Sequence, residues 1–156
     1  MTKPRRKPAA PELRALNRSL PMELLKAREA AMSRFRPMLR EFGLTEQQWR
    51  VIRVLCEFGR LDASELARRS MLLAPSLTRI LQFLEGEGLV RRLADRGDQR
   101  RAFLELSPRG ERLFASVAPA SESIYAEMEG AFGASRMDAL YTLLADFYGL
   151  LEGAQK

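Results

Sequence analysis

Residues 89–106 contain two short strand-like runs, Leu89–Leu93 and Ala102–Leu106, on either side of an eight-residue segment rich in arginine, aspartate and glycine. Apolar runs of this length flanking turn-forming residues are typical of a β-hairpin. Most of the rest of the chain repeats its apolar residues at three- and four-residue steps, which indicates helices. The sequence therefore predicts a mainly α-helical fold with one small hairpin, whose long tip is basic because it carries Arg96, Arg100 and Arg101.

Two short helices are expected immediately before this hairpin. Ser64 is the predicted N-cap of the first, and the second begins near Pro75, since proline suits the first helical turn. The second helix is apolar on one side, and its other side carries polar residues that could contact base edges in a major groove. This order of elements is a helix-turn-helix followed by a wing, which favours DNA binding over the alternative, a plain helical core with a charged loop. The polar set is Ser76, Thr78, Arg79 and Gln82.

Long helices are expected at both ends of the chain, at about 19–42 and 108–152, around a winged helix at about 44–107. A capping box from Thr45 to Gln48 opens the helix after Gly43, Ser107 caps the helix after the hairpin, and Ser135 with Asp138 caps the last one. The terminal helices carry more apolar surface than the winged helix can cover. This predicts an intermolecular core in a homodimer; packing of both ends within one chain is the alternative.

The composition of the 156 residues disfavours an enzyme. There is no histidine, which removes Ser-His and Cys-His catalysis and histidine-ligated zinc. No catalytic, cofactor-binding or metal-binding residues are therefore expected. The single cysteine and the lack of an apolar signal or membrane-spanning run indicate a cytoplasmic protein without membrane contacts.

The net charge of +6 is unevenly distributed. Residues 1–18 carry +5 and residues 91–101 carry +3, whereas residues 102–156 carry −4. Two basic segments beside an acidic C-terminal third suggest a face that binds a polyanion and another face with a different role. The proline-rich segment 1–18 is expected to be a flexible basic arm, which is either a DNA contact or merely a solvated tail.

The hairpin also contains a recognisable motif. Asp98-Gln99-Arg100, five further residues and then Leu106-Ser107 resemble the D-x-R-x5-L-[ST] wing motif of the MarR family of transcriptional regulators. Residues 64–67 and 77–90 are similar to the helix-turn-helix of that family. Residues 27–32 and 43–53 resemble its homoprotocatechuate-degradation regulators. The resemblance covers about residues 19–152 and leaves out the N-terminal arm.

The resemblance implies a homodimeric repressor of aromatic-acid catabolic genes that binds a palindromic operator and is released by a phenolic carboxylate. The expected DNA contacts are the polar set of the second helix together with Arg96, Asp98, Arg100 and Arg101 of the wing, with Asp98 orienting Arg100. A winged-helix or architectural DNA-binding protein without an effector is the alternative.

A carboxylate effector needs a cation and an apolar or aromatic wall. The predicted effector site combines Arg28 and Trp49 with Ser19 and Met22 near the start of the first helix. Each assignment has an alternative, since Arg28 could extend to solvent and Trp49 could be a core residue. Cys56 is expected in the core beside Leu55 rather than as a peroxide sensor, because a reactive thiol needs an accessible, thiolate-stabilising setting.

Overall fold

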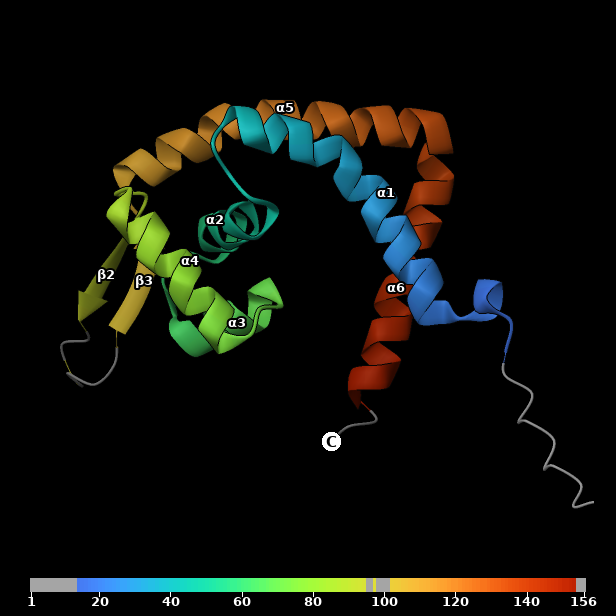
Figure 1. Cartoon of the computed structure of the whole chain (residues 1–156), viewed down its shortest axis with the longest axis horizontal. Coiled ribbons are helices and arrows are strands. Elements are labelled where there is room, and N and C mark those ends of the chain that lie inside the picture. The colour runs from blue at the N-terminus through green and yellow to red at the C-terminus, as the bar shows by residue number, and fades with distance from the viewer. Residues whose placement is uncertain (1–13, 95–96, 98–101, 154–156) are drawn as a thin grey trace, which may run out of the picture. The chain divides into compact units, whose positions relative to one another are not determined.

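The computed structural model describes residues 14–94, 97 and 102–153 (Figure 1). These residues belong to two compact units, 1–33 and 34–156, and each unit is described by itself. The described part of the first unit contains a 3-10 turn, η1 (Leu16–Arg18), and the beginning of helix α1 (Leu20–Glu41). Residues 16–18, placed in the flexible arm by the sequence, thus form a short turn. A single domain over 19–156 stays a prediction.

The second unit begins in α1 and contains a helix-turn-helix with a small sheet, as the sequence predicts. The sheet is antiparallel with strand order β1-β3-β2, and Val90 pairs with Leu106 at the base of the hairpin. Figure 1 shows α3 and α4 beside the β2–β3 hairpin. The elements after α1 are α2 (Glu46–Phe58), β1 (Leu61–Asp62), α3 (Ala63–Ser70), α4 (Ala74–Gly86), β2 (Val90–Ala94), β3 (Ala102–Leu106), α5 (Pro108–Phe132) and α6 (Ala134–Gly153).

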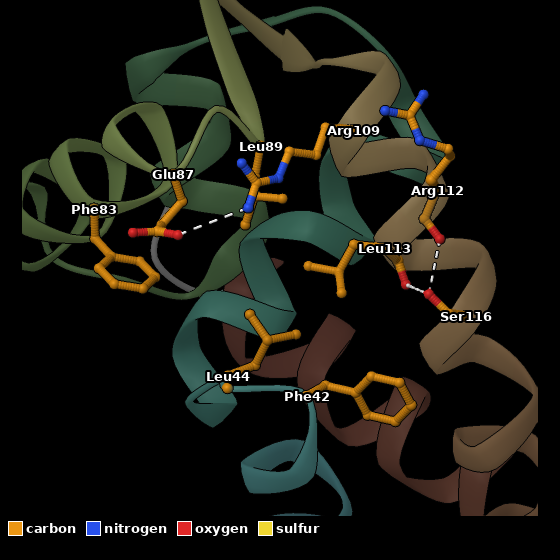
Figure 2. Close-up of a pocket in the computed structure, with 10 residues that line it drawn as sticks. Phe42, Leu44, Phe83, Glu87, Leu89, Arg109, Arg112, Leu113 and Ser116 are labelled. Carbon is orange, nitrogen blue, oxygen red and sulfur yellow. Dashed lines mark hydrogen bonds and ion pairs between the residues drawn. The ribbon is translucent and has the colours of Figure 1, made fainter.

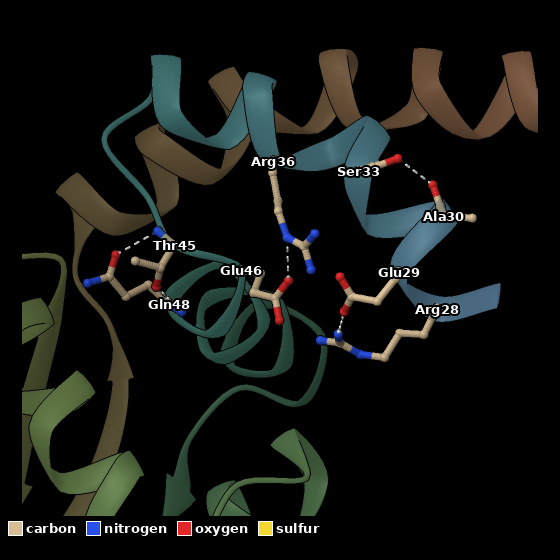
Figure 3. A network of polar contacts seen from close by, with 8 residues as sticks. All are labelled: Arg28, Glu29, Ala30, Ser33, Arg36, Thr45, Glu46 and Gln48. Atoms are coloured by element: carbon tan, nitrogen blue, oxygen red, sulfur yellow. Dashed lines mark hydrogen bonds and ion pairs between the residues drawn. The ribbon is translucent and has the colours of Figure 1, made fainter. Parts of the chain in front are cut away.

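Two helix starts are as predicted and two are not. The capping box of α2 is present, since Thr45 Oγ1 accepts from the Gln48 N–H and Gln48 Oε1 accepts from the Thr45 N–H (Figure 3). Ser107 caps α5. The N-cap of α3 is Asp62 rather than Ser64, because Asp62 ends β1 with its carboxylate 2.8 Å from the Glu65 N–H. Helix α6 begins at Ala134, so Ser135 lies inside it.

The core of the second unit joins the helix-turn-helix to the sheet. Ile52 of α2, Leu66 of α3, Leu84 of α4 and Leu104 of β3 are completely buried, and Val117 of α5 is buried with them. Each of these residues lies at an apolar position of its element, so hydrophobic burial fixes α3 and α4 relative to the hairpin.

Ser107 and Gly110 connect the base of the wing to α5. Ser107 Oγ donates to the Gly88 carbonyl at 2.6 Å and accepts from the Gly110 N–H at 3.0 Å. The Ser107 N–H donates to the Leu89 carbonyl at 3.0 Å. A Cβ at Gly110 would lie 2.1 Å from that same carbonyl oxygen, so only glycine permits this close approach. The serine at the end of the wing motif is therefore a joint between strand and helix.

Helix α6 has no buried residue, although its mean hydropathy is that of an apolar helix. No helix in the described part of the chain is long and apolar enough to cross a membrane. The large apolar side chains that α6 exposes are Leu140, Tyr141, Leu143, Leu144, Phe147, Tyr148, Leu150 and Leu151.

Candidate nucleic-acid interface

Helix α4 separates its apolar and polar residues as the sequence predicts. Leu77, Ile80, Leu81 and Leu84 are buried, and this packing turns the opposite side of the helix outward. Thr78, Arg79 and Gln82 are exposed and Ser76 is half-buried. Thr78 Oγ1 donates to the Ala74 carbonyl at 3.0 Å, so its hydroxyl is already bonded within the helix. DNA contact by these four residues stays a prediction.

The two arginines of strand β2, Arg91 and Arg92, form ion pairs with carboxylates. Arg91 Nε lies 2.6 Å and Arg60 Nε 3.2 Å from the Glu105 carboxylate. Partial desolvation raises the pKa of Glu105, but the hydrogen bonds and the positive charges of Arg91 and Arg60 together outweigh it and hold the pKa below its ordinary value. Arg92 pairs with Glu85 of α4 at 2.9 Å. The predicted wing contacts Arg96, Asp98, Arg100 and Arg101 lie outside the described residues.

The turn between α3 and α4 has two exposed apolar side chains that sequence reasoning did not single out. Met71 is 69% exposed and Leu73 is 78% exposed, whereas Leu72 between them is half-buried. The backbone of Met71 is left-handed, with φ 52° and ψ 48°. The available signal was the run of three large apolar residues at a position where turns usually have small or polar ones.

The predicted effector residues belong to different units. Ser19, Met22 and Arg28 lie in the first unit, where Ser19 and Met22 are half-buried and Arg28 Nη1 lies 2.9 Å from Glu29 Oε1 (Figure 3). Trp49 lies in the second unit and is only 6% exposed. Its ring stacks on Phe114 of α5 with the centroids 5.5 Å apart, so Trp49 holds α2 against α5.

Arg53 of α2, one helical turn after Trp49, is another candidate cation for an effector, and sequence reasoning missed it. Arg53 Nη1 lies 3.1 Å from the hydroxyl of Tyr125, and its guanidinium carbon is 6.0 Å from the centroid of that ring. Residues four apart share a helix face, so the Trp49–Arg53 spacing was the available signal. The guanidinium can bind a carboxylate, and the phenol beside it can form a hydrogen bond with a hydroxyl group.

A hollow of about 390 Å³ lies within the second unit, where the end of α1, the end of α4 and the start of α5 meet. Figure 2 shows Phe42, Phe83 and Leu113 on its wall, with Arg109 Nη2 4.0 Å from Glu87 Oε2. None of the predicted effector residues lines this hollow. Its aromatic rings and arginines nevertheless suit an aromatic anion, so it competes with the predicted effector site.

Cys56 is exposed, so its predicted place in the core is wrong. Helix α2 turns Val51, Ile52, Val54 and Leu55 inward, which leaves Cys56 at the edge of the buried face. Desolvation raises the pKa of the thiol, and the negative charges of Glu111 and Glu57 raise it further. The thiol therefore stays protonated at neutral pH, which is the opposite of a reactive cysteine.

A helix-turn-helix with an adjoining β-hairpin defines this chain as a winged-helix protein. The MarR family model matches residues 44–102. The homoprotocatechuate degradative operon repressor of Escherichia coli is 43% identical over 138 residues, which are 88% of this chain and 93% of the relative. The chain belongs to the MarR family.

Solved structures agree in sequence and fold. Transcriptional regulator PA4135 is 43% identical with a TM-score of 0.81, over 84% of this chain and 96% of that one. NadR in complex with 4-hydroxyphenylacetate is 40% identical with a TM-score of 0.79, over 86% of this chain and 98% of that one. The protein is accordingly a DNA-binding transcriptional regulator and not an enzyme.

Proposed function

We propose that this regulator represses genes for aromatic-acid catabolism and is released from DNA by a phenolic carboxylate. The likeness to the Escherichia coli operon repressor over 88% of the chain is the observation that carries the proposal. The NadR structure with 4-hydroxyphenylacetate supports the chemical class of the effector, because that molecule is a phenol with a carboxylate. The repressor would act in the cytoplasm, where the DNA and such metabolites are found together.

The DNA contacts of the proposal are the exposed face of α4 and the tip of the wing. Arg79 and Gln82 offer donors to base edges in the major groove. The strand arginines Arg91 and Arg92 are already paired with carboxylates. We assign the contacts to phosphates to the tip, with Arg96, Arg100 and Arg101 as the cations and Asp98 orienting Arg100.

An effector releases DNA only by binding the DNA-incompatible arrangement more tightly. To change the ratio of the DNA-incompatible to the DNA-compatible arrangement from 1:99 to 99:1, the effector must bind the incompatible one more tightly by about 5.5 kcal/mol. One hydrogen bond to a charged group contributes about 1.5–3 kcal/mol, so several contacts must act together. In our proposal Arg28 binds the carboxylate and Trp49 contacts the ring, with Ser19 and Met22 completing the site.

The effector site can be tested by titrating 4-hydroxyphenylacetate and homoprotocatechuate into the protein–operator complex. We expect Arg28→Ala to leave operator affinity nearly unchanged and to raise the concentration needed for release by tenfold or more, because the carboxylate loses its cation. Lys26→Ala is the matched control, since Lys26 is an exposed cation on the same helix, paired with Glu23 at 2.8 Å.

Two further variants locate the site if Arg28 is not the cation. Arg53→Ala tests the guanidinium beside Tyr125, and Arg109→Ala tests the hollow at the start of α5. If the Arg28→Ala variant releases the operator at the same effector concentration as the wild type, Arg28 is not the carboxylate ligand. If no aromatic acid releases the wild-type complex, the protein is a winged-helix regulator without this class of effector.

A further inference from the structure

We propose that Met71 and Leu73, in the turn before α4, contact the 5-methyl groups of thymines in the major groove. The proposal rests on α4 being the recognition helix. It adds an apolar component to the polar contacts expected from Arg79 and Gln82, and it assigns a specificity-determining role to two residues outside that polar set.

The first observation is exposure. At 78%, Leu73 is the most exposed large apolar side chain in the described part of the chain, and Met71 is 69% exposed. Single exposed apolar residues are common and carry no conclusion by themselves. Here two of them flank the half-buried Leu72 in the turn immediately before α4, the helix that carries the exposed Arg79 and Gln82.

The second observation is the backbone of Met71. Among the described residues it is the only non-glycine with a positive φ. Met71 follows the end of α3, and helices commonly end with glycine in this conformation because a Cβ is unfavourable there. A methionine at this position costs conformational energy that glycine would avoid. The local backbone therefore does not favour methionine at this position.

The third observation is the start of α4. Leu73 is its N-cap and makes no side-chain capping hydrogen bond. Serine, threonine, aspartate and asparagine are preferred at this position because they supply the acceptor for that bond. Leucine is therefore unfavourable for the helix start and, being exposed, contributes little to the core. Both turn positions hold residues that local structure does not favour.

The position of the turn identifies what these side chains contact. In a helix-turn-helix the N-terminal residues of the recognition helix approach the base edges. The major groove contains one apolar group, the thymine C5-methyl; the leucine side chain is wholly apolar, and methionine adds only a weak sulfur acceptor. Thymine methyl groups in each half-site are therefore the partners that match their chemistry.

The test uses a duplex that the full-length protein enriches from random-sequence DNA. Each thymine of the half-site is replaced in turn by deoxyuridine, which removes only the methyl group. For the wild-type protein we expect at least one replacement to weaken binding about fourfold, the factor corresponding to one methyl-sized group losing an apolar contact. Thymines outside the half-sites are the DNA control.

Met71→Gly and Leu73→Ser are the informative variants because each suits the local backbone better than the native residue. We expect both to keep or raise the midpoint of thermal unfolding, and both to weaken binding to the thymine duplex. At the thymine whose replacement weakens wild-type binding, deoxyuridine should cause no further loss of affinity in one of the two variants, Leu73→Ser or Met71→Gly. Leu73→Met keeps an apolar side chain and should keep the sensitivity to the methyl group.

Three outcomes would overturn the proposal. Wild-type affinity of both variants would show that the turn does not contact DNA. A full deoxyuridine penalty in both variants would show that other residues contact the methyl groups. If no deoxyuridine replacement weakens binding of the wild-type protein, no methyl group is contacted. A different result, in which the protein enriches no duplex and binds all DNA weakly, would contradict sequence-specific regulation itself.

Discussion

Arg79 is the only arginine of α4, and its side chain is exposed. A guanidinium can make a bidentate contact with a guanine. We expect Arg79→Ala to relax base preference and to weaken binding to the cognate duplex by about 1–3 kcal/mol. Competition between cognate and random duplexes measures the change in preference.

For Arg100, an arginine of the wing, we expect a different effect on DNA binding from that of Arg79. Arg100→Ala should weaken binding to all sequences alike and should reduce the slope of log affinity against log salt by about one, because one phosphate contact is lost. Equal weakening of cognate and random DNA by Arg79→Ala would show that α4 presents a different face to the bases.

At the scale of elements, the wing is held to α5 by a contact that a single methyl group would disrupt. A Cβ at Gly110 would lie 2.1 Å from the backbone oxygen of Leu89, and backbone cannot move aside as a side chain can. We expect Gly110→Ala to lower the free energy of unfolding by about 1–3 kcal/mol or more, the usual range for overpacking. Chemical denaturation measures it.

Gly130 provides the control on the same helix, since a Cβ there would meet nothing within 4 Å. Gly130→Ala should therefore stabilise the protein by about 0.5–1 kcal/mol, as alanine is the better helix former. If both variants were equally stable, the approach of α5 to Leu89 would not restrict the residue at 110.

Helix α3 contains a carboxylate that makes stability depend on pH. Glu65 lies 2.7 Å from Arg68 and 2.6 Å from Arg69, and the hydrogen bond from Arg68 is the main cause that lowers its pKa to about 2. A lowered pKa in the folded state contributes stability above the unfolded value of about 4.3, and this contribution disappears as the pH falls toward 2.

Glu65→Gln should therefore be less stable than the wild type at pH 6, and the difference should shrink as the pH falls from about 5 to 2. Thermal unfolding at a series of pH values measures it. Glu87→Gln is the control, because the Glu87 carboxylate lies 4.0 Å from Arg109 and exposed pairs contribute little. A pH-independent difference for Glu65→Gln would exclude the linkage.

The helices and the hairpin could be predicted because their apolar spacing is the packing pattern itself. Helix starts were less predictable where two residues could serve as the cap. Asp62 ends a strand that forms only through long-range pairing with Phe103, so its role in capping α3 depends on tertiary structure. The exposure of Cys56 depends likewise on which side of α2 faces its neighbours.

At the scale of the whole molecule, the site was less predictable than the fold. The polar face of α4 follows from helical periodicity. The apolar turn at Met71 and Leu73 does not, because exposure and a left-handed backbone are properties of the folded chain. The sequence could not show which cation binds an effector carboxylate either, since Arg28, Arg53 and Arg109 differ in their surroundings rather than in their chemistry.

The exposed apolar side chains of α6 require a partner surface, and a second copy of the chain is the partner we expect. Leaving so many large apolar residues in water is unfavourable, whereas an isologous interface covers the same patch on both chains. The mass in solution at micromolar concentration should be twice the 17.7 kDa of one chain. Analytical ultracentrifugation measures it.

Disruption of this interface should also disrupt operator binding. Leu144→Glu with Phe147→Glu places two charges on one face of α6, so we expect monomers, whereas Asp146→Asn on the same helix is the control and should stay dimeric.

A dimer with a two-fold axis presents two α4 helices to half-sites about one helical turn apart, roughly 34 Å. Inserting five base pairs between the half-sites turns the second one to the opposite face of the duplex, so we expect affinity to fall to that of a single half-site. A monomeric mass with undiminished operator binding, or equal affinity for both spacings, would show that the chain binds DNA without this symmetry.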